Sequence, residues 1–304
     1  MTAIPRIAVF GGTGFLGRAV ASRLTGSGMA VRIVARHADS AAGENPSGLV
    51  EYRAADIRDE AAVSAALRDA DGVVNAVSLY VERPGGPSFE AIHVEGAGRL
   101  AALAGQTGVG SLVHISGIGA DEASASPYVR ARARGEQRVR SAFPGAVILR
   151  PSVLFGPGDA FLRSLEMITR RLPVVPLFGR GGTRLQPVYV EDMAAGIERA
   201  LQSPEARGRT FELGGAGIHT YREIIAMVLD HLHRRRLLVP VPFAAWHLLA
   251  TLASILPGPP LTRDQVILME SDNVVGHGMS GFSDLGITAH AMAPLLGICL
   301  DART

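Results

Sequence analysis

The first residues that could do chemistry form a glycine-rich run near the start of the chain. It consists of Gly11, Gly12, Thr13, Gly14, Phe15, Leu16 and Gly17. Glycines at positions 11, 14 and 17 permit a tight turn, close approach of the backbone to a pyrophosphate, and close packing of a helix on a strand. Unpaired N–H groups at the helix start would then meet the phosphates. We therefore expect a dinucleotide cradle, with an ordinary strand-to-helix turn as the alternative.

Arg36 is the residue expected to choose between the two nicotinamide dinucleotides. It ends the second strand candidate, and no acidic residue precedes Asp39 there. An acid at this place binds the ribose 2′-hydroxyl of NAD, whereas an arginine accepts the 2′-phosphate of NADP. A guanidinium matches phosphate in charge and geometry. The sequence thus favours NADP(H) over NAD(H), and an exposed arginine without a ligand is the alternative.

Two further strand ends complete the predicted nucleotide site. Asp56, followed by Ile57, comes directly after the third strand candidate. A side chain at this place can reach the adenine amino group. Asn75 and Ala76 end the fourth strand candidate, which brings their backbone close to the middle of the cofactor.

Alternating apolar and amphipathic segments must position these residues. Strands are expected at 7–10, 30–35, 49–54, 72–76, 111–115 and 146–149, and helices at 15–24, 59–67, 88–106 and 127–142. The alternation predicts a parallel sheet covered by helices on both faces. Asp59 is expected to cap helix 59–67, and Thr220 and Glu223 to form a capping box. The stretch 37–48 is expected to be a loop.

The predicted fold is therefore α/β, a Rossmann-type doubly wound parallel sheet with a smaller C-terminal α/β lobe. We place the dinucleotide-binding region at 1–150, continued by parts of 183–215, and the smaller lobe at 151–304. Beyond residue 150, proline and glycine cluster at 151–158, 173–182 and 257–260. Such clusters indicate a lobe assembled from long connections.

Composition excludes several classes of protein. Apolar residues make up 47% of the chain, and the formal net charge of +2 gives no argument for a nucleic-acid partner. The single cysteine, Cys299, excludes an internal disulfide and is expected to be a small core residue rather than a nucleophile. His231 and His233 lack accompanying ligand spacing, so no metal site is expected.

The start of the chain and its longest apolar segment indicate where in the cell the protein is expected. The first strand candidate begins a few residues after Met1, so we expect no signal peptide and a cytoplasmic protein. The apolar stretch 243–256 is shorter than the ~18 residues that span a bilayer, so no transmembrane helix is expected.

The stretch 243–256 is also a candidate for a helix facing a membrane or a partner. Arginines at 234–236 precede it, and its polar residues at 247, 251 and 254 fall on one narrow stripe of an otherwise apolar helix. A basic cluster beside a broad apolar face can rest on an anionic bilayer or dock on a partner. A buried helix with a small polar stripe is the more common meaning of such a pattern.

A set of motifs in fixed order covers most of the chain. They are the run 11–17, Asp56, Asn75, His114-Ile115-Ser116, Tyr128, the run 149–157 and the run 187–192. In these motifs the chain resembles the short-chain dehydrogenase/reductase superfamily, in its extended or atypical branch. The resemblance implies a catalytic tyrosine, a lysine four residues later that lowers the pKa of the tyrosine and holds the nicotinamide ribose, and a serine that polarises a carbonyl. It also implies cofactor contacts at Pro151 and Val153.

Tyr128 and Ser116 match that pattern, but Arg132 occupies the lysine position. No lysine could replace it, since all 30 residues counted as Lys+Arg are arginine. Arg132 shares a helical face with Tyr128, and its charge could lower the phenol pKa from about 10. A guanidinium is bulkier, however, and never deprotonated. Tyr128, Arg132 and Ser116 are thus candidates for both catalysis and cofactor contact, with a structural phenol as the alternative.

The C-terminal half carries a second resemblance. The runs 179–192, 211–215, 220–223, 261–266 and 272–275 look like those of the nucleotide-binding accessory subunit of respiratory complex I, alpha subcomplex subunit nine, and its bacterial relatives. In that family a tightly held NADPH is regarded as structural, and the protein sits on the peripheral arm close to the membrane. The resemblance implies a weakly catalytic or non-catalytic NADPH-binding protein.

Three functions follow as hypotheses. The first is an accessory or assembly subunit of complex I that holds NADP(H), with complex I subunits and the cytoplasmic face of the inner membrane as partners. The second is an NADP(H)-dependent reductase, epimerase or dehydratase acting on a carbonyl, quinone or sugar-nucleotide substrate through Tyr128. A redox-sensing regulator is a third, supported by the cofactor site alone.

Overall fold

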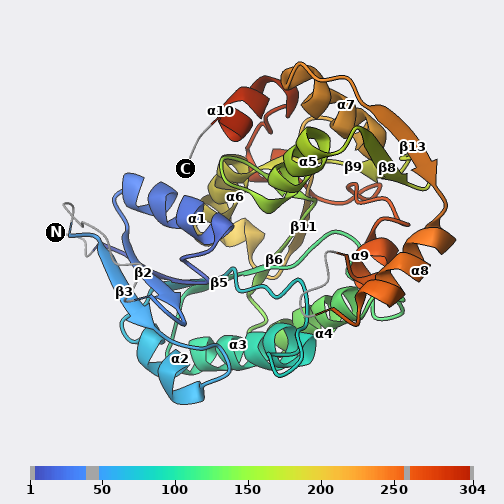
Figure 1. The fold of residues 1–304 in the computed structure, drawn as a ribbon. Helices are drawn as coiled ribbons and strands as arrows, with labels where there is room; N and C mark the ends of the chain where they lie inside the picture. Colours follow the sequence, from blue (N-terminus) through green and yellow to red (C-terminus); the bar gives the residue numbers. More distant parts are fainter. Residues whose placement is uncertain (1–3, 39–47, 257–260, 302–304) are drawn as a thin grey trace.

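The computed structural model describes residues 4–38, 48–256 and 261–301, and it is built around a seven-stranded sheet (Figure 1). In order across the sheet the strands are β3 (Val50–Ala54), β2 (Ala30–Ala35), β1 (Arg6–Phe10), β4 (Gly72–Asn75), β5 (Ser111–Ile115), β6 (Val147–Pro151) and β11 (Thr210–Leu213). Every neighbouring pair is parallel. The strand order reverses between β1 and β4, where doubly wound sheets bind ligands. The predicted Rossmann-type fold is confirmed.

Helices cover both faces of this sheet. One face carries α1 (Phe15–Gly26) and α6 (Val190–Gln202), and the other carries α2 (Glu60–Leu67), α3 (Ala97–Gln106) and α4 (Pro127–Ala142) (Figure 1). Side chains alternate along a strand. On β1, Ile7 and Val9 therefore enter the core under α1 and α6, whereas Ala8 and Phe10 enter the core under α2 and α3.

Local signals place most helix starts correctly. The side chain of Asp59 accepts a hydrogen bond from the Ala62 N–H at 3.0 Å, and Thr220 and Glu223 form the predicted capping box at the start of α7 (Tyr221–His231). Asp39 and most of the loop predicted at 37–48 lie outside the described residues.

The helix predicted at 88–106 differs from the prediction, because its first part is a π-helix, η2 (Glu90–Gly96), that continues into α3. The backbone of α4 passes very close to η2. A Cβ on Gly135 would lie 2.0 Å from the His93 carbonyl oxygen. Apolar periodicity does not distinguish a π-turn from an α-turn, and such turns often occur at functional sites.

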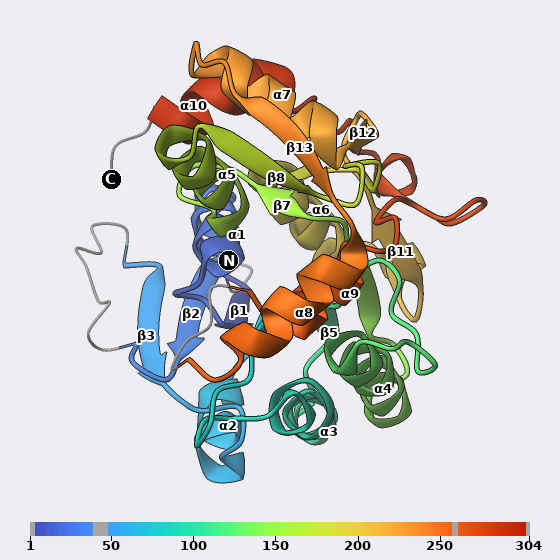
Figure 2. The ribbon, with the colours of Figure 1, turned by 45° about the vertical axis from the view of Figure 1, so that its right-hand side comes forward.

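A second lobe packs beside the carboxyl edge of the sheet (Figure 2). Its strands are β7 (Leu154–Phe155), β8 (Val174–Phe178), β9 (Arg184–Leu185), β10 (Val188–Tyr189), β12 (His219–Thr220) and β13 (Leu237–Val241), and its longer helices are α5 (Ala160–Arg171) and α7. Cys299, on α10 (Leu296–Asp301), is buried in the core of this lobe. Short 3-10 turns lie at Pro204–Ala206, Phe282–Leu285 and Ala293–Leu295.

Helices α8 (Phe243–Ala253) and α9 (Arg263–Leu268) pack on each other between the second lobe and α4 (Figure 2). Only Ala250 of α8 is buried, so the interpretation of this segment as a buried helix is wrong. Leu248, Leu249 and Leu252 are each more than half exposed. The polar stripe is divided: Thr251 and Ser254 are exposed, whereas His247 turns to the protein and contacts Glu270 at 2.9 Å.

Candidate functional site

The glycine loop has the geometry of a nucleotide cradle. Gly11 has φ +79°, and a Cβ there would lie 2.7 Å from the Ala76 carbonyl oxygen. A Cβ on Gly17 would lie 2.2 Å from the Gly11 carbonyl oxygen, so the helix can approach the loop only without a side chain. Gly14 is the N-cap of α1, and its N–H donates to the Gly11 carbonyl at 2.9 Å. The bare backbone and the start of α1 fit a pyrophosphate.

The other members of the loop hold it in place. The carbonyl of Thr13 accepts a hydrogen bond from Arg18 Nη1 at 2.6 Å. Leu16 is buried in the core beneath α1. Phe15 points toward the second lobe, where a Cβ on Gly156 would lie 3.2 Å from its ring. The loop therefore lies where the two lobes meet.

Arg36 and Asp56, which follow β2 and β3, lie close together. Arg36 is exposed directly after β2, and its charge contributes to lowering the pKa of Asp56. The largest cause of that lowered pKa is Arg58, whose Nε and Nη2 donate to the Asp56 carboxylate at 3.0 and 2.7 Å. Arg58 was not among the predicted site residues, although its spacing from Asp56 suits such a pair. Ile57 between them is buried.

At the end of β4, Asn75 is held by a buried histidine. Asn75 Nδ2 lies 3.1 Å from His114 Nδ1, and Asn75 Oδ1 accepts from the Val77 N–H at 3.2 Å. Burial, with the nearby charge of Arg132, lowers the pKa of His114 to about 3. His114 is therefore neutral at pH 7, and its Nδ1 can accept from Asn75. This pairing fixes the chain at Ala76, which faces Gly11.

Tyr128 is enclosed by three other rings. Its side chain is 7% exposed, and the ring centroids of Tyr80, Phe89 and His93 lie 5.7, 5.6 and 5.4 Å from its own. Burial raises the pKa of Tyr128, and the charge of Arg132 opposes this only in part. The charge of Arg132 does lower the pKa of Tyr128, as expected, but desolvation is the larger effect and the net shift is upward.

Arg132 directs its guanidinium to the face of that ring. Its Cζ lies 4.7 Å from the Tyr128 ring centroid, and its Nη2 donates to Ser78 Oγ at 3.3 Å. Gly117 makes room for it, because a Cβ there would lie 2.7 Å from Arg132 Nη1. Ser78 and Gly117 were not among the predicted site residues, and nothing in their local pattern distinguished them.

Two buried polar atoms of this region have no hydrogen-bond partner among the described residues. They are Ser116 Oγ, at the end of β5, and Arg132 Nε. Leaving such atoms unpaired costs about 1–3 kcal/mol each. Arg132 stacks on Tyr128, and Gly117, next to Ser116, lies against Arg132 Nη1. The two unpaired atoms therefore lie in one region at the carboxyl edge of the sheet, which fits a polar ligand such as the nicotinamide ribose of a dinucleotide.

Pro151 and Val153 lie at the end of β6. The Pro151 carbonyl accepts from the Ile118 N–H, two residues beyond Ser116, at 3.1 Å. The Val153 carbonyl accepts from the Val188 N–H of the second lobe at 2.9 Å. Pro151 is thus tied to the Ser116 strand end, whereas Val153 is tied to the second lobe.

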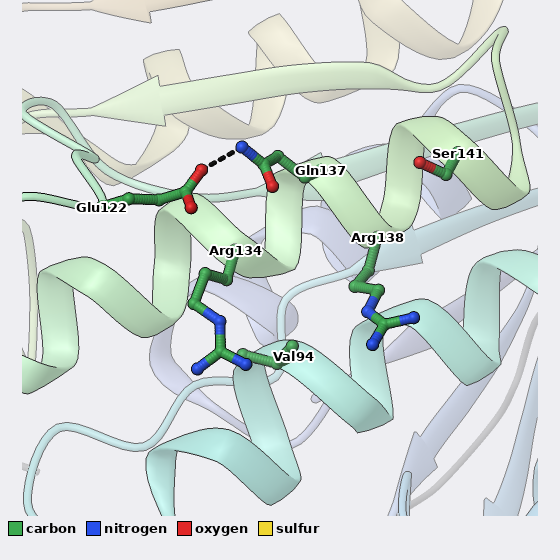
Figure 3. Close-up of a pocket in the computed structure, with 6 residues that line it drawn as sticks. All are labelled: Val94, Glu122, Arg134, Gln137, Arg138 and Ser141. Carbon is green, nitrogen blue, oxygen red and sulfur yellow. Dashed lines mark hydrogen bonds between the residues drawn. The ribbon is translucent and has the colours of Figure 1, made fainter.

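A shallow polar pocket lies apart from these residues (Figure 3). It has a volume of about 350 Å³ and is lined by Val94, Glu122, Arg134, Gln137, Arg138 and Ser141. None of its lining residues is among the predicted site residues. In the described ranges 4–38, 48–256 and 261–301, no group of three or more His, Cys, Asp or Glu side chains could hold a metal ion.

Comparisons with known proteins agree with this geometry. Residues 7–214 match the model of the NAD dependent epimerase/dehydratase family. NADH dehydrogenase [ubiquinone] 1 alpha subcomplex subunit 9 of Arabidopsis thaliana is 31% identical over 93% of this chain and 74% of its own length. Ceramide reductase of Caulobacter vibrioides is 30% identical over 65% of this chain and 61% of its own length. The structure of MoeE5 in complex with UDP-glucose and NAD superposes with a TM-score of 0.73 at 19% identity, covering 97% of both chains.

Proposed function

Because the chain belongs to the NAD dependent epimerase/dehydratase family, the extended branch of the short-chain dehydrogenase/reductases, we propose that it binds NADP(H) and holds it as a mainly structural cofactor. We propose further that it does so as an accessory or assembly subunit of respiratory complex I. The glycine loop and the strand ends at Asp56, Asn75 and Ser116 would hold the nucleotide. When bound, it would supply a hydride donor next to Ser116 and Tyr128.

The choice of NADP(H) over NAD(H) rests on the adenosine end. Arg36 is exposed at the end of β2, and no acidic side chain of the described residues is paired with it in the way that Asp56 is paired with Arg58. A 2′-phosphate carries the charge that a guanidinium prefers. The alternative of an exposed arginine without a ligand predicts equal affinity for the two nucleotides.

The main support for a structural rather than a catalytic role of the cofactor is that Tyr128 is enclosed. A general acid must reach the substrate, and its pKa should lie near the working pH. Tyr128 is instead buried among rings, its pKa is raised, and the cation that could activate it stacks on its face. These features favour a phenol that packs the site over one that transfers protons.

The proposed partner rests on the relatives. The identity to alpha subcomplex subunit 9 extends over 93% of the chain and so includes the second lobe as well as the nucleotide region. We propose contact with complex I subunits at the cytoplasmic face of the inner membrane. Affinity purification of the tagged chain from native membranes, followed by mass spectrometry, tests this proposal. Recovery of complex I subunits would support it, and recovery of the chain alone would contradict it.

Helix α8 supports a peripheral position at the membrane. Its leucines at 248, 249 and 252 are exposed. The exposed arginines 170, 171, 234 and 235 lie near the other end of the β8–β13 pair, where Arg236 Nε donates to the Thr169 carbonyl at 2.9 Å. The length of β13 therefore separates the basic cluster from α8, and the proposed membrane contact rests on the exposed apolar face of α8. No helix of the described residues has the length and apolarity needed to cross a membrane.

A second candidate function is an active NADP(H)-dependent reductase, epimerase or dehydratase. It is favoured by the unpaired Ser116 Oγ beside Arg132 and by the similarity to a protein named as a ceramide reductase. In this case Tyr128 would transfer a proton and Ser116 would orient a carbonyl, with Arg132 as electrostatic support. NADPH oxidation by a panel of carbonyl, quinone and sugar-nucleotide compounds, lost on Tyr128→Phe, would support this function.

A further inference from the structure

The segment 262–273 contacts the candidate site at two points that are distant in sequence. On α9, Asp264 Oδ1 accepts a hydrogen bond from Ser126 Oγ at 2.5 Å. Farther along, Asn273 Nδ2 donates to the Ile118 carbonyl at 3.4 Å. Ser126 lies two residues before Tyr128, and Ile118 lies two residues after Ser116. The segment therefore touches the chain next to both candidate catalytic positions.

The contact at Asp264 is part of the start of α4. Ser126 is the N-cap of that helix and is fully buried, and its Oγ also accepts from the Val129 N–H at 3.2 Å. Burial raises the pKa of Asp264, and the bond from Ser126, the charge of Arg130 and the backbone N–H of Tyr128 oppose that rise. A carboxylate at a helix N-terminus is favourable because it faces unpaired N–H groups.

The same segment is attached to α8. Helices α8 and α9 pack on each other, and His247 Nε2 of α8 lies 2.9 Å from Glu270 Oε1 just after α9. The exposed leucines of α8 are thus connected through α9 and Asp264 to the turn of α4 that carries Tyr128. Asp264, which is half-buried, is thus the side chain of α9 that bonds to the start of α4.

We propose that Asp264 is a positioning residue that couples α8 to the nucleotide site, an inference that rests on the proposed nucleotide binding. A nucleotide that orders Ser116 and the start of α4 also orders α9 and α8, because the Ser126–Asp264 bond joins them. By linkage, a partner that holds α8 in place strengthens nucleotide binding by the same factor. Coupling between sites commonly amounts to about 5–150-fold.

Hydrogen exchange of the full-length protein, first stripped of its bound nucleotide and then measured with and without saturating NADP+, tests the coupling. In the unsubstituted protein we expect protection of the loop 11–17 and, at a distance, protection of α9 amides by about fivefold or more. In Asp264→Ala the loop remains protected while the protection of α9 is lost. Asp272→Ala is the matched control, because Asp272 lies in the same segment but pairs with the exposed Arg184. It retains both effects.

The outcomes separate the inference from the function on which it rests. An unprotected loop in the unsubstituted protein would contradict nucleotide binding itself. A protected loop with unprotected α9, or α9 protection that survives Asp264→Ala, would overturn the coupling alone. Amides of β1 and β4 report whether each variant is folded. If Asp264→Ala does not fold, Ser126→Ala removes the other half of the same bond and has the same expected result.

Discussion

Arg132 Cζ lies 4.7 Å from the centroid of the Tyr128 ring, one helical turn earlier on α4. This stacking places the guanidinium on the face of the ring, and Nη2 donates a hydrogen bond to Ser78 Oγ. A lysine ammonium is a compact charge on a flexible stem, whereas the guanidinium is a planar group that stacks on aromatic rings. Arg132 and Tyr128 therefore form a packed pair in the candidate site.

Gly17→Ala is expected to abolish nucleotide binding, because its Cβ would lie 2.2 Å from the backbone oxygen of Gly11. The loop must then open, and we expect NADP+ affinity to fall by at least about 100-fold, since a displaced cradle loses several hydrogen bonds to charged groups of about 1.5–3 kcal/mol each. Calorimetric titration measures this loss. Gly26→Ala on the same helix is the control, because its Cβ would meet nothing within 4 Å. Equal affinities in the two variants would contradict the cradle.

Arg36→Leu is expected to weaken NADP+ binding and leave NAD+ binding nearly unchanged. Loss of a hydrogen-bonded charge pair of about 1.5–3 kcal/mol corresponds to about 10–150-fold in affinity for NADP+. Competition between the two nucleotides measures the ratio directly. Arg68→Leu, another exposed arginine that follows α2, should change neither affinity. An unchanged NADP+/NAD+ ratio in Arg36→Leu would remove the argument for NADP(H).

Acid should destabilise the protein through two buried histidines. Burial, followed by the charge of Arg132, lowers the pKa of both His93 and His114 to about 3. The unfolded chain binds protons on these rings as pH falls through about 6.5, whereas the folded chain does not. The contribution of these two rings to the free energy of unfolding is therefore complete above pH 6.5. It decreases between pH 6.5 and pH 3 by about 1.4 kcal/mol per pH unit for each ring.

Urea unfolding between pH 6.5 and 4.5 measures how the free energy of unfolding changes with pH. His114→Gln should reduce this slope by the contribution of about one proton. The exposed His277→Gln is the control and should leave the slope as it is. A slope that His114→Gln does not change would mean that His114 takes up its proton in the folded chain.

Leu248→Glu with Leu252→Glu is expected to reduce binding to vesicles that contain anionic lipid. The two leucines are 61% and 58% exposed, so their replacement costs little folding stability and the melting temperature should change little. Vesicle co-sedimentation measures the binding. Ile298→Glu, at a 56% exposed position on α10, is the matched control and should bind as the unsubstituted protein does. Unaltered binding of the α8 variant would contradict the proposed membrane face.

Some elements of the structure could be predicted from the sequence, and others could not. Strand 30–35 and helix 127–142 were predicted with their observed bounds, because apolar patterning and a proline at the first turn are local signals. The enclosure of Tyr128 was not predictable, since Tyr80, Phe89 and His93 reach it from elements distant in sequence. The orientation of α8 was not predictable either. Its composition shows that it is apolar, but not which face the rest of the protein covers.

Tyr128→Phe separates a packing phenol from a catalytic one. If the ring serves mainly to pack against Phe89 and His93, the variant should retain bound NADP(H) and lose at most about 1.5 kcal/mol of stability, the value of one hydrogen bond. Thermal unfolding and nucleotide content measure both. A large loss of a carbonyl-dependent NADPH oxidation in Tyr128→Phe would favour the enzyme instead.

Native mass spectrometry, with absorbance at the NADPH band, distinguishes a chain that holds NADP(H) from one that consumes it. Protein that has been purified and dialysed extensively is expected to carry one NADP(H) per chain, and its bound NADPH is expected not to be oxidised when carbonyl compounds are added. A chain that emerges from dialysis without nucleotide, or whose bound NADPH is turned over by an added carbonyl, would contradict a structural role of the cofactor.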